Sequence, residues 1–220
     1  MVRRLASLLL AFLFLLGWTA CGKEEEHLLQ FSPLQPGDPI AIMDTDLGEI
    51  RLRLFPKQAP LAVESFQRHA QAGDYNGVEF HRVIGQFMIQ SGDIGSTDPY
   101  YEDEFSTQLW HFRGALSVAN TGREDTNSTQ FFIVQAASDS EMFQQVKEQL
   151  AQEEAYPQEV LDKYMELGGA PWLDGKHTVF GYVYQGMEIV DQISQVQTDR
   201  DYRPVEPVRI RSVTIDSYQP

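Results

Sequence analysis

Three separated segments of the chain combine large apolar side chains with a few polar groups. They are residues 80–93 with Arg82 and Gln90, residues 116–133 with Asn120 and Gln130, and residues 172–181 with His177. This mixture is typical of an apolar pocket in which a small number of donors orient the ligand. Arg82 is the only permanent cation assigned to the pocket, because a guanidinium is always charged. The sequence therefore predicts a binding slot with one fixed positive charge.

The elements that must position these segments read mainly as short strands. Residues 40–43 and 50–55 are an expected strand pair, because apolar and charged residues alternate through the second of them. Helices are expected over residues 60–72, which begin with proline, and over about 187–196. Many strands with few helices indicate a β-barrel or a β-sandwich.

The C-terminal residues 204–218 are expected to be extended. Their apolar spacing changes between Ile210 and Val213, which predicts a β-bulge.

Taken together and in this order, the three segments resemble cyclophilin-type peptidyl-prolyl cis-trans isomerases. The resemblance covers roughly residues 40–216, and we take residues 40–218 as one domain. It implies a mainly β fold, a closed eight-stranded antiparallel barrel capped by two helices. In one turn the sequence departs from the family, since Gly85-Gln86 stands where Pro-Gly is usual.

Residues 138–171 are longer than the few residues that compact cyclophilins have here. Ser138-Asp139-Ser140-Glu141 is a capping-box signal, and apolar residues follow at helical spacing. Pro157 can start a second helix that Gly168-Gly169 ends. We expect a helical hairpin inserted at 139–170, beside the slot. It is either a structural lid or an element that shapes substrate choice and is dispensable for the chemistry.

The activity that the resemblance implies is acceleration of Xaa-Pro isomerisation while exported proteins fold. Rotation about this bond faces a barrier of about 18–20 kcal/mol, because amide resonance must be broken. A cation that donates to the twisted prolyl nitrogen stabilises the transition state more than the planar ground state. Arg82 is the implied donor, and Gln90 would orient it or hold the substrate carbonyl.

The resemblance also implies the residues that bind substrate. The residues that would line the proline slot are Phe87, Met88, Phe132 and Leu173, and His177 would close its rim. The substrate main chain would be bound by Asn120 and by the backbone of Ala119 and Asn120. Gln130 and Trp172 complete the set of implied substrate-binding residues. Trp172 stands at the position associated with cyclosporin, which makes cyclosporin a candidate ligand. Two other functions stay open, a non-catalytic proline-peptide binding module and a holdase-type chaperone. The presence of Arg82 together with Gln90 favours the enzyme.

The N-terminus reads as an export signal over residues 1–20, with a positive start, a short apolar run and small residues before Cys21. Cys21 resembles the lipidated cysteine of bacterial lipoproteins. The alternative is cleavage nearby, which would leave a free thiol. Residues 21–39 are then a lipidated N-terminus and linker. The expected location is the bacterial cell envelope, with a lipid anchor in the outer membrane and the domain facing the periplasm or the surface.

The acidity of the chain limits its partners. The 220 residues include 17 Lys and Arg against 32 Asp and Glu, a formal net charge of −15. Phosphate binding needs a basic footprint, so nucleic acid is excluded as a partner. The histidines lack a metal-like spacing, and no metal or other cofactor is expected. We expect a monomer that binds proline-containing peptides and unfolded chains and meets a membrane only through its lipid.

Overall fold

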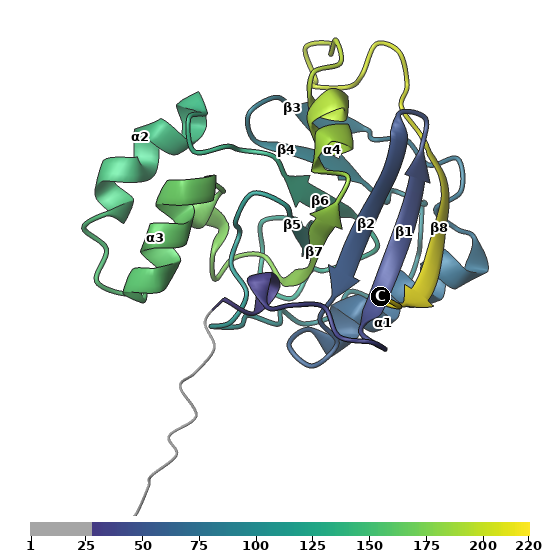
Figure 1. Ribbon diagram of the computed structural model, residues 1–220. Helices are drawn as coiled ribbons and strands as arrows, with labels where there is room; N and C mark the ends of the chain where they lie inside the picture. Colours follow the sequence, from purple (N-terminus) through teal and green to yellow (C-terminus); the bar gives the residue numbers. More distant parts are fainter. Residues whose placement is uncertain (1–27) are drawn as a thin grey trace, which may run out of the picture.

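The computed structural model describes residues 28–220, so the predicted signal peptide and Cys21 lie outside it. One antiparallel sheet curls around the core in the strand order β3-β4-β6-β5-β7-β2-β1-β8 (Figure 1). The strands are β1 (Pro39–Thr45), β2 (Gly48–Leu54), β3 (Arg82–Ile84), β4 (Met88–Ser91), β5 (Ala115–Val118), β6 (Phe131–Val134), β7 (Val179–Gln185) and β8 (Ile210–Ser217). The predicted eight-stranded, mainly β fold is confirmed.

The two edge strands, β3 and β8, share no ladder of their own. Instead, the chain segments at their starts meet: Phe80 N–H donates to the Val208 carbonyl at 2.9 Å, and the N–H of Ile210, the first residue of β8, donates to the Val78 carbonyl at 2.9 Å. The sheet edges are therefore joined only by a short stretch of backbone pairing at the start of the two strands, where a complete barrel would have a full ladder.

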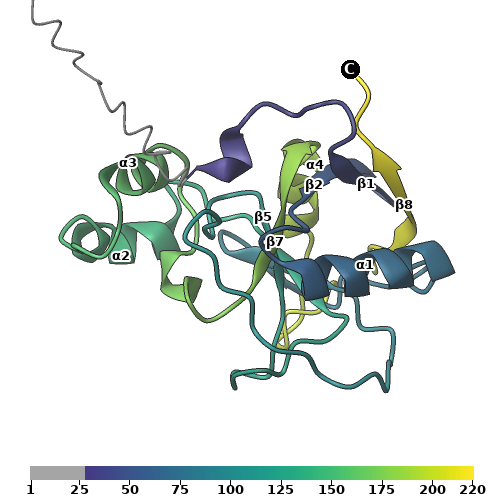
Figure 2. The ribbon, with the colours of Figure 1, turned by 90° about the horizontal axis from the view of Figure 1, so that it is seen from below.

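Helices α1 (Pro60–Ala72) and α4 (Met187–Ser194) cover the two ends of the curled sheet. Figure 2 shows α1 lying across one of these openings. The apolar stripe of α1 (Ala62, Val63, Phe66 and Ala70) is buried in the main core. Gly73 ends the helix with a φ of 79°, a left-handed conformation that suits glycine.

The predicted bulge is present in the ladder between β1 and β8. Thr45 pairs with Ile210 and Asp44 pairs with Ser212, which leaves Arg211 as the extra residue. The bulge lets Ile210 and Val213 both face the core although they are three residues apart.

The inserted hairpin consists of α2 (Glu141–Leu150) and α3 (Gln158–Leu167), which lie beside the barrel in Figure 1. The capping box predicted from Ser138 is wrong in position. Ser140 is the N-cap, and its Oγ accepts from Phe143 N–H at 3.3 Å. The apolar faces of both helices meet Phe112 of the barrel in a separate core cluster. The hairpin is therefore an integral part of the domain's packing.

The predicted linker is shorter than the sequence indicated. Residues 28–38 pack on the domain, and η1 (Leu29–Phe31) lies against the hairpin cluster. Gln30 is 4% exposed; its side chain donates to the Trp110 carbonyl at 2.9 Å and accepts from Trp110 N–H at 2.8 Å. Arg53 donates to the Ser32 carbonyl at 2.7 Å. The prediction that residues 21–39 form a linker is thus wrong for residues 28–39, since residues 28–38 pack on the domain and Pro39 begins β1.

No helix within residues 28–220 is long and apolar enough to cross a membrane.

Candidate functional site

The candidate site lies on the face of β3, β4 and β6 opposite the main core. Strand pairing places Arg82 beside Gln90, and Gln90 beside Phe132, in one row across three strands. Because side chains alternate along a strand, Ile89 and Phe131 point into the main core while Met88, Gln90 and Phe132 face the site. The sheet register therefore assembles residues from the first two sequence segments.

A cavity of about 260 Å³ lies on this face. Every residue that lines it is among those predicted: Arg82, Phe87, Met88, Gln90, Ala119, Asn120, Phe132, Leu173 and His177. Met88 is 1% exposed and Phe132 is 4% exposed, so the apolar floor is fixed by packing. The structure thus brings the three sequence segments together around one slot.

The polar side of the slot is a chain of hydrogen bonds. Arg82 Nη1 donates to Gln90 Oε1 at 3.3 Å, and Gln90 Nε2 donates to Gln130 Oε1 at 3.0 Å. Gln130 does not line the cavity, and its contact fixes which way the Gln90 amide points. Within residues 28–220, no carboxylate lies within ion-pair distance of Arg82, whose charge is therefore not neutralised by a neighbour.

His177 closes the rim as a neutral imidazole. Its Nδ1 lies 3.1 Å from the Val118 carbonyl, which can only accept, so Nδ1 carries the proton and Nε2 is an acceptor. Burial lowers the pKa of His177 below the ordinary histidine value of about 6.5, and this effect outweighs the hydrogen bond to the Val118 carbonyl, which raises the pKa. Its ring meets Phe132 edge to face, with centroids 5.4 Å apart.

The main-chain contacts predicted for Ala119 and Asn120 need refinement. Ala119 N–H already donates to the Gln130 carbonyl at 2.9 Å, so only the Ala119 carbonyl can serve a substrate. The Asn120 side chain donates to the Lys176 carbonyl at 2.8 Å and accepts from Gly122 N–H at 3.0 Å. Asn120 therefore braces the loops around the slot with the two ends of its amide.

Trp172 lies beside the slot and does not line it. Its ring centroid is 5.6 Å from that of Phe87, on the slot wall, and Trp172 lines a neighbouring groove. Trp172, predicted among the residues of the slot and its rim, thus lies outside the slot itself, because η2 (Pro171–Leu173) directs Leu173 to the slot and Trp172 to the groove.

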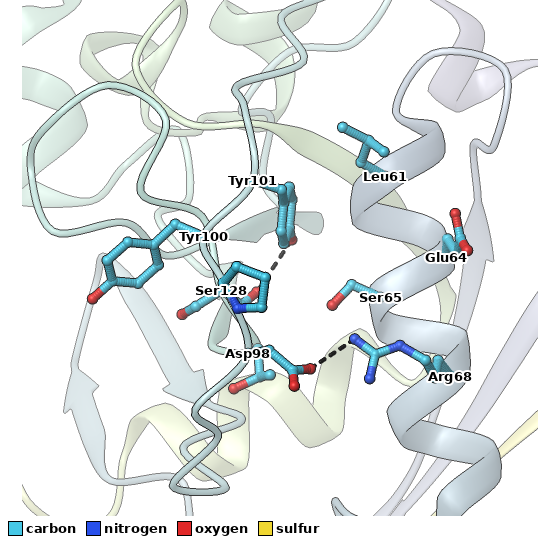
Figure 3. Close-up of a pocket in the computed structure, with 10 residues that line it drawn as sticks. Leu61, Glu64, Ser65, Arg68, Asp98, Tyr100, Tyr101 and Ser128 are labelled. Atoms are coloured by element: carbon cyan, nitrogen blue, oxygen red, sulfur yellow. Dashed lines mark hydrogen bonds and ion pairs between the residues drawn. The ribbon is translucent and has the colours of Figure 1, made fainter.

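A larger cavity, about 340 Å³, lies elsewhere, between α1 and residues 98–101 (Figure 3). Its polar walls are paired with each other. Arg68 donates to Asp98 at 2.8 Å, and Tyr101 donates to the Ser128 carbonyl at 3.1 Å. The cavity contains none of the predicted site residues, so its size does not make it the active-site candidate.

A family model described as "Cyclophilin type peptidyl-prolyl cis-trans isomerase/CLD" matches residues 40–215. The chain belongs to the cyclophilin family. A Staphylococcus aureus (strain USA300) protein named as a peptidyl-prolyl cis-trans isomerase is 41% identical over 191 residues, covering 83% of this chain and 94% of that protein. A Staphylococcus epidermidis relative is 40% identical over the same length.

Solved cyclophilin structures share the fold. A Cryptosporidium parvum cyclophilin-type isomerase, crystallised in the presence of the dipeptide Ala-Pro, has a TM-score of 0.63 and 24% identity. It covers 81% of this chain and 99% of its own length. Another structure of the same protein gives a TM-score of 0.64.

Beside the cyclophilin slot, the structure contains a buried network that the sequence did not predict. Asp174 Oδ1 lies 2.7 Å from His111 Nδ1 and accepts from His111 N–H at 3.0 Å. Asp174 Oδ2 accepts from Tyr156 at 2.9 Å and from Tyr164 at 2.6 Å. The Asp174 side chain is 9% exposed, and four donors make its burial as a carboxylate tolerable.

This network connects the hairpin to the slot. Both tyrosines come from the insertion, and burial raises the pKa of each, so their hydroxyls remain protonated donors. The His111 ring stacks on Phe132 with centroids 6.1 Å apart and an interplanar angle of 11°. Asp174 lies inside one of the three motifs, but nothing in the sequence indicated its partners in the insertion.

The Gly85-Gln86 turn, which departs from the family pattern, is a second connection between the slot and the hairpin. Gln86 has a φ of 62°, a left-handed conformation that glycine adopts more readily. Its Oε1 accepts from Glu141 N–H, the first residue of α2, at 2.8 Å. The residue that replaces the usual glycine thus joins the slot turn to the hairpin.

Over the described part of the chain, no group of three or more His, Cys, Asp or Glu residues could hold a metal ion.

Proposed function

We propose that this cyclophilin accelerates the cis-trans isomerisation of Xaa-Pro bonds and that Arg82 carries the catalysis. The observation behind this proposal is the position of the Arg82 guanidinium. It lies at the edge of an apolar cavity, is hydrogen-bonded to Gln90, and has no carboxylate partner in the described chain to cancel its charge. A fixed cation beside an apolar pocket matches the needs of the twisted prolyl bond.

The mechanism rests on the different contacts that the slot makes with the planar and with the twisted prolyl amide bond. The proline ring enters the apolar cavity over Phe132 and Met88. As the bond twists, resonance is lost and the prolyl nitrogen becomes basic. An N–H of Arg82 then donates to that nitrogen, an interaction absent from the planar amide. Gln90, held by Gln130, keeps the guanidinium in place.

The remaining polar groups position the substrate. The Ala119 N–H is already bonded to the Gln130 carbonyl, so the Ala119 carbonyl is the backbone group of this residue that can accept a hydrogen bond from a substrate N–H. His177 Nε2 is a second acceptor at the rim. Neither group takes part in proton transfer, since the reaction makes and breaks no covalent bond.

Exchange NMR on a Xaa-Pro tetrapeptide tests the proposal. Catalytic amounts of the protein should broaden the separate cis and trans resonances or produce exchange cross-peaks between them, because uncatalysed exchange takes tens of seconds or longer. Shifts of the peptide resonances without faster exchange would overturn the proposal and favour the non-catalytic binding module.

The holdase alternative receives less support from the hairpin. A holdase would need the apolar stripes of α2 and α3 to face solvent. Phe143, Val160 and Tyr164 are each 0% exposed in the cluster shared with the barrel. These side chains therefore cannot bind a client without opening the domain.

We also propose the cellular setting, on the sequence signals at the N-terminus. Residues 1–20 act as an export signal, and Cys21 carries the lipid that holds the protein at the bacterial cell envelope. Its clients are then exported chains. Cyclosporin is a proposed inhibitor, supported by Trp172 and Phe87 standing together at the edge of the slot.

A further inference from the structure

A second groove lies on the hairpin side of the slot. Its volume is about 180 Å³, and its lining is Val146, Gln149, Leu150, Glu153, Tyr156, Pro171 and Trp172. Helix α2 forms one wall, and η2 with Tyr156 forms the other. The lining is mainly apolar and includes one carboxylate, that of the exposed residue Glu153.

This groove adjoins the slot through a pair of touching rings. Trp172 lines the groove, Phe87 lines the slot, and their centroids are 5.6 Å apart. Leu173, the next residue after Trp172, also lines the slot. Since an extended chain advances roughly 3.3–3.6 Å per residue, a few residues of a bound peptide are enough to reach from the slot to the groove.

The groove is held open by fixed contacts. The Tyr156 hydroxyl donates to Asp174 at 2.9 Å and lies 3.2 Å from the Pro171 carbonyl, which fixes the ring against η2. At the other wall, Gln86 accepts from the first backbone N–H of α2. These bonds tie both walls to the slot, so little reorganisation is needed for binding.

We propose that the groove is a substrate subsite that takes a large apolar side chain, aliphatic or aromatic, two to four residues from the proline. The occupant is the same chain that fills the slot, so the inference rests on the proposed function. The volume supports a side chain, because pockets for separate small molecules are typically about 300–1,000 Å³. Glu153 adds a preference for a neighbouring lysine or arginine.

The groove also explains what the insertion contributes to substrate choice. Val146, Gln149 and Leu150 all come from α2, so a cyclophilin without the hairpin would lack this wall. The slot recognises proline, whereas the groove reads a residue outside the reacting dipeptide.

Peptide binding followed by NMR titration tests the proposal without relying on turnover. The probes are a tetrapeptide with a central Xaa-Pro, and twelve-residue peptides that extend it with Leu, Phe or Ala at each position two to four residues away on either side. Leu and Phe at one of these positions should bind about tenfold more tightly than Ala, the effect expected from partly burying one such side chain. Equal affinity for Leu, Phe and Ala at every position would overturn the proposal.

Two groove variants sharpen the test. Val146→Gln should remove the tenfold preference and leave tetrapeptide affinity unchanged, whereas Glu148→Gln, on the same helix and outside the groove, should change neither. Equal weakening of short and long peptides by Val146→Gln would overturn the subsite. Glu153→Lys should reverse the preference between lysine- and glutamate-bearing peptides, and an unchanged preference would count against the proposed role of its charge.

The exchange measurement separates this inference from the proposed function. Failure of the subsite would leave isomerisation of the tetrapeptide intact. Failure of the isomerase would leave the preference for an apolar flanking residue measurable as binding.

Discussion

His111 Nδ1 lies 2.7 Å from Asp174 Oδ1, and the same carboxylate receives the hydroxyls of Tyr156 and Tyr164 through its other oxygen. One buried anion therefore joins the inserted hairpin to the histidine that stacks on the slot floor. Removal of the whole hairpin would take away two of the four donors and expose the Phe112 cluster. Deletion is thus a poor test of whether the chemistry needs the hairpin, and point variants are better.

We expect Tyr164→Phe to lower the free energy of unfolding by about 1.5–3 kcal/mol, the usual worth of a hydrogen bond to a charged group. The lost bond is the 2.6 Å contact with Asp174, and Tyr164 is fully buried. Urea denaturation gives the measurement. Tyr100→Phe, at a residue that is 57% exposed, is the control and should change stability little. An equal effect of both variants would show that the network does not stabilise the fold.

Arg82→Ala should lower kcat/KM on a tetrapeptide by about 10²–10³-fold, the usual effect of removing one preorganised charge-stabilising donor. The exposed Arg82 side chain has no ion pair to lose in the described chain, so stability should barely change. Arg211→Ala, on β8 and outside the slot, is the control for activity; unlike Arg82, it loses an ion pair, its contact with Asp46 at 3.1 Å. Undiminished activity in a folded Arg82→Ala protein would rule out the proposed role of this residue.

At the slot turn, Gln86→Gly should be more stable than Gln86→Ala by about 1 kcal/mol, because only glycine relaxes at the observed φ of 62°. Both variants lose the bond to Glu141, so their difference isolates the backbone conformation. Thermal or urea unfolding supplies the comparison. The same two substitutions at Glu148, inside α2, should show the opposite order of stability, with Glu148→Ala more stable than Glu148→Gly, since alanine is the better helix former.

Stability should contain a pH-dependent part that comes from His177. Burial lowers its pKa in the folded protein below 6.5, so the unfolded chain takes up the proton first as pH falls. The free energy of unfolding should therefore decrease below about pH 6.5 and level off below the folded pKa. His177→Asn keeps a donor near Val118 and should make the pH dependence shallower in this window. Identical pH profiles for both proteins would contradict the predicted shift.

Cys21→Ser should move the protein from the membrane to the soluble fraction, because stable anchoring depends on the acyl chains. Intact mass spectrometry of the membrane-extracted wild type should give the mass of a chain that starts at Cys21 and carries lipid. A mature mass without lipid would reject the anchor.

The slot could be predicted from the sequence because its residues lie in short motifs on paired strands. Met88 and Gln90 are two apart and share a face, and the ladder then places Gln90 beside Phe132. The hairpin helices were also predictable, since their apolar spacing and Gly168 are local signals.

The links between the hairpin and the barrel could not be predicted in this way. The contact of Tyr164 with Asp174 depends on how α3 docks on the barrel, and no local sequence pattern specifies that placement. Residues 28–38 looked like a linker because of their prolines and glycine, yet Gln30 finds two backbone partners on residue 110. Tertiary contacts outweigh composition at such positions.

If Cys21 carries the proposed lipid, the docking of residues 28–31 limits how far the folded body can stand from a bilayer. With the proposed lipid on Cys21, seven peptide steps separate the anchor from Leu28, and even a fully extended chain of that length spans only about 25 Å. Because Leu28 and Phe31 pack on the hairpin cluster, the hairpin side would be the one held nearest the proposed lipid. The catalytic cleft would then work within a thin layer above the membrane, accessible mainly to chains that pass close to its surface.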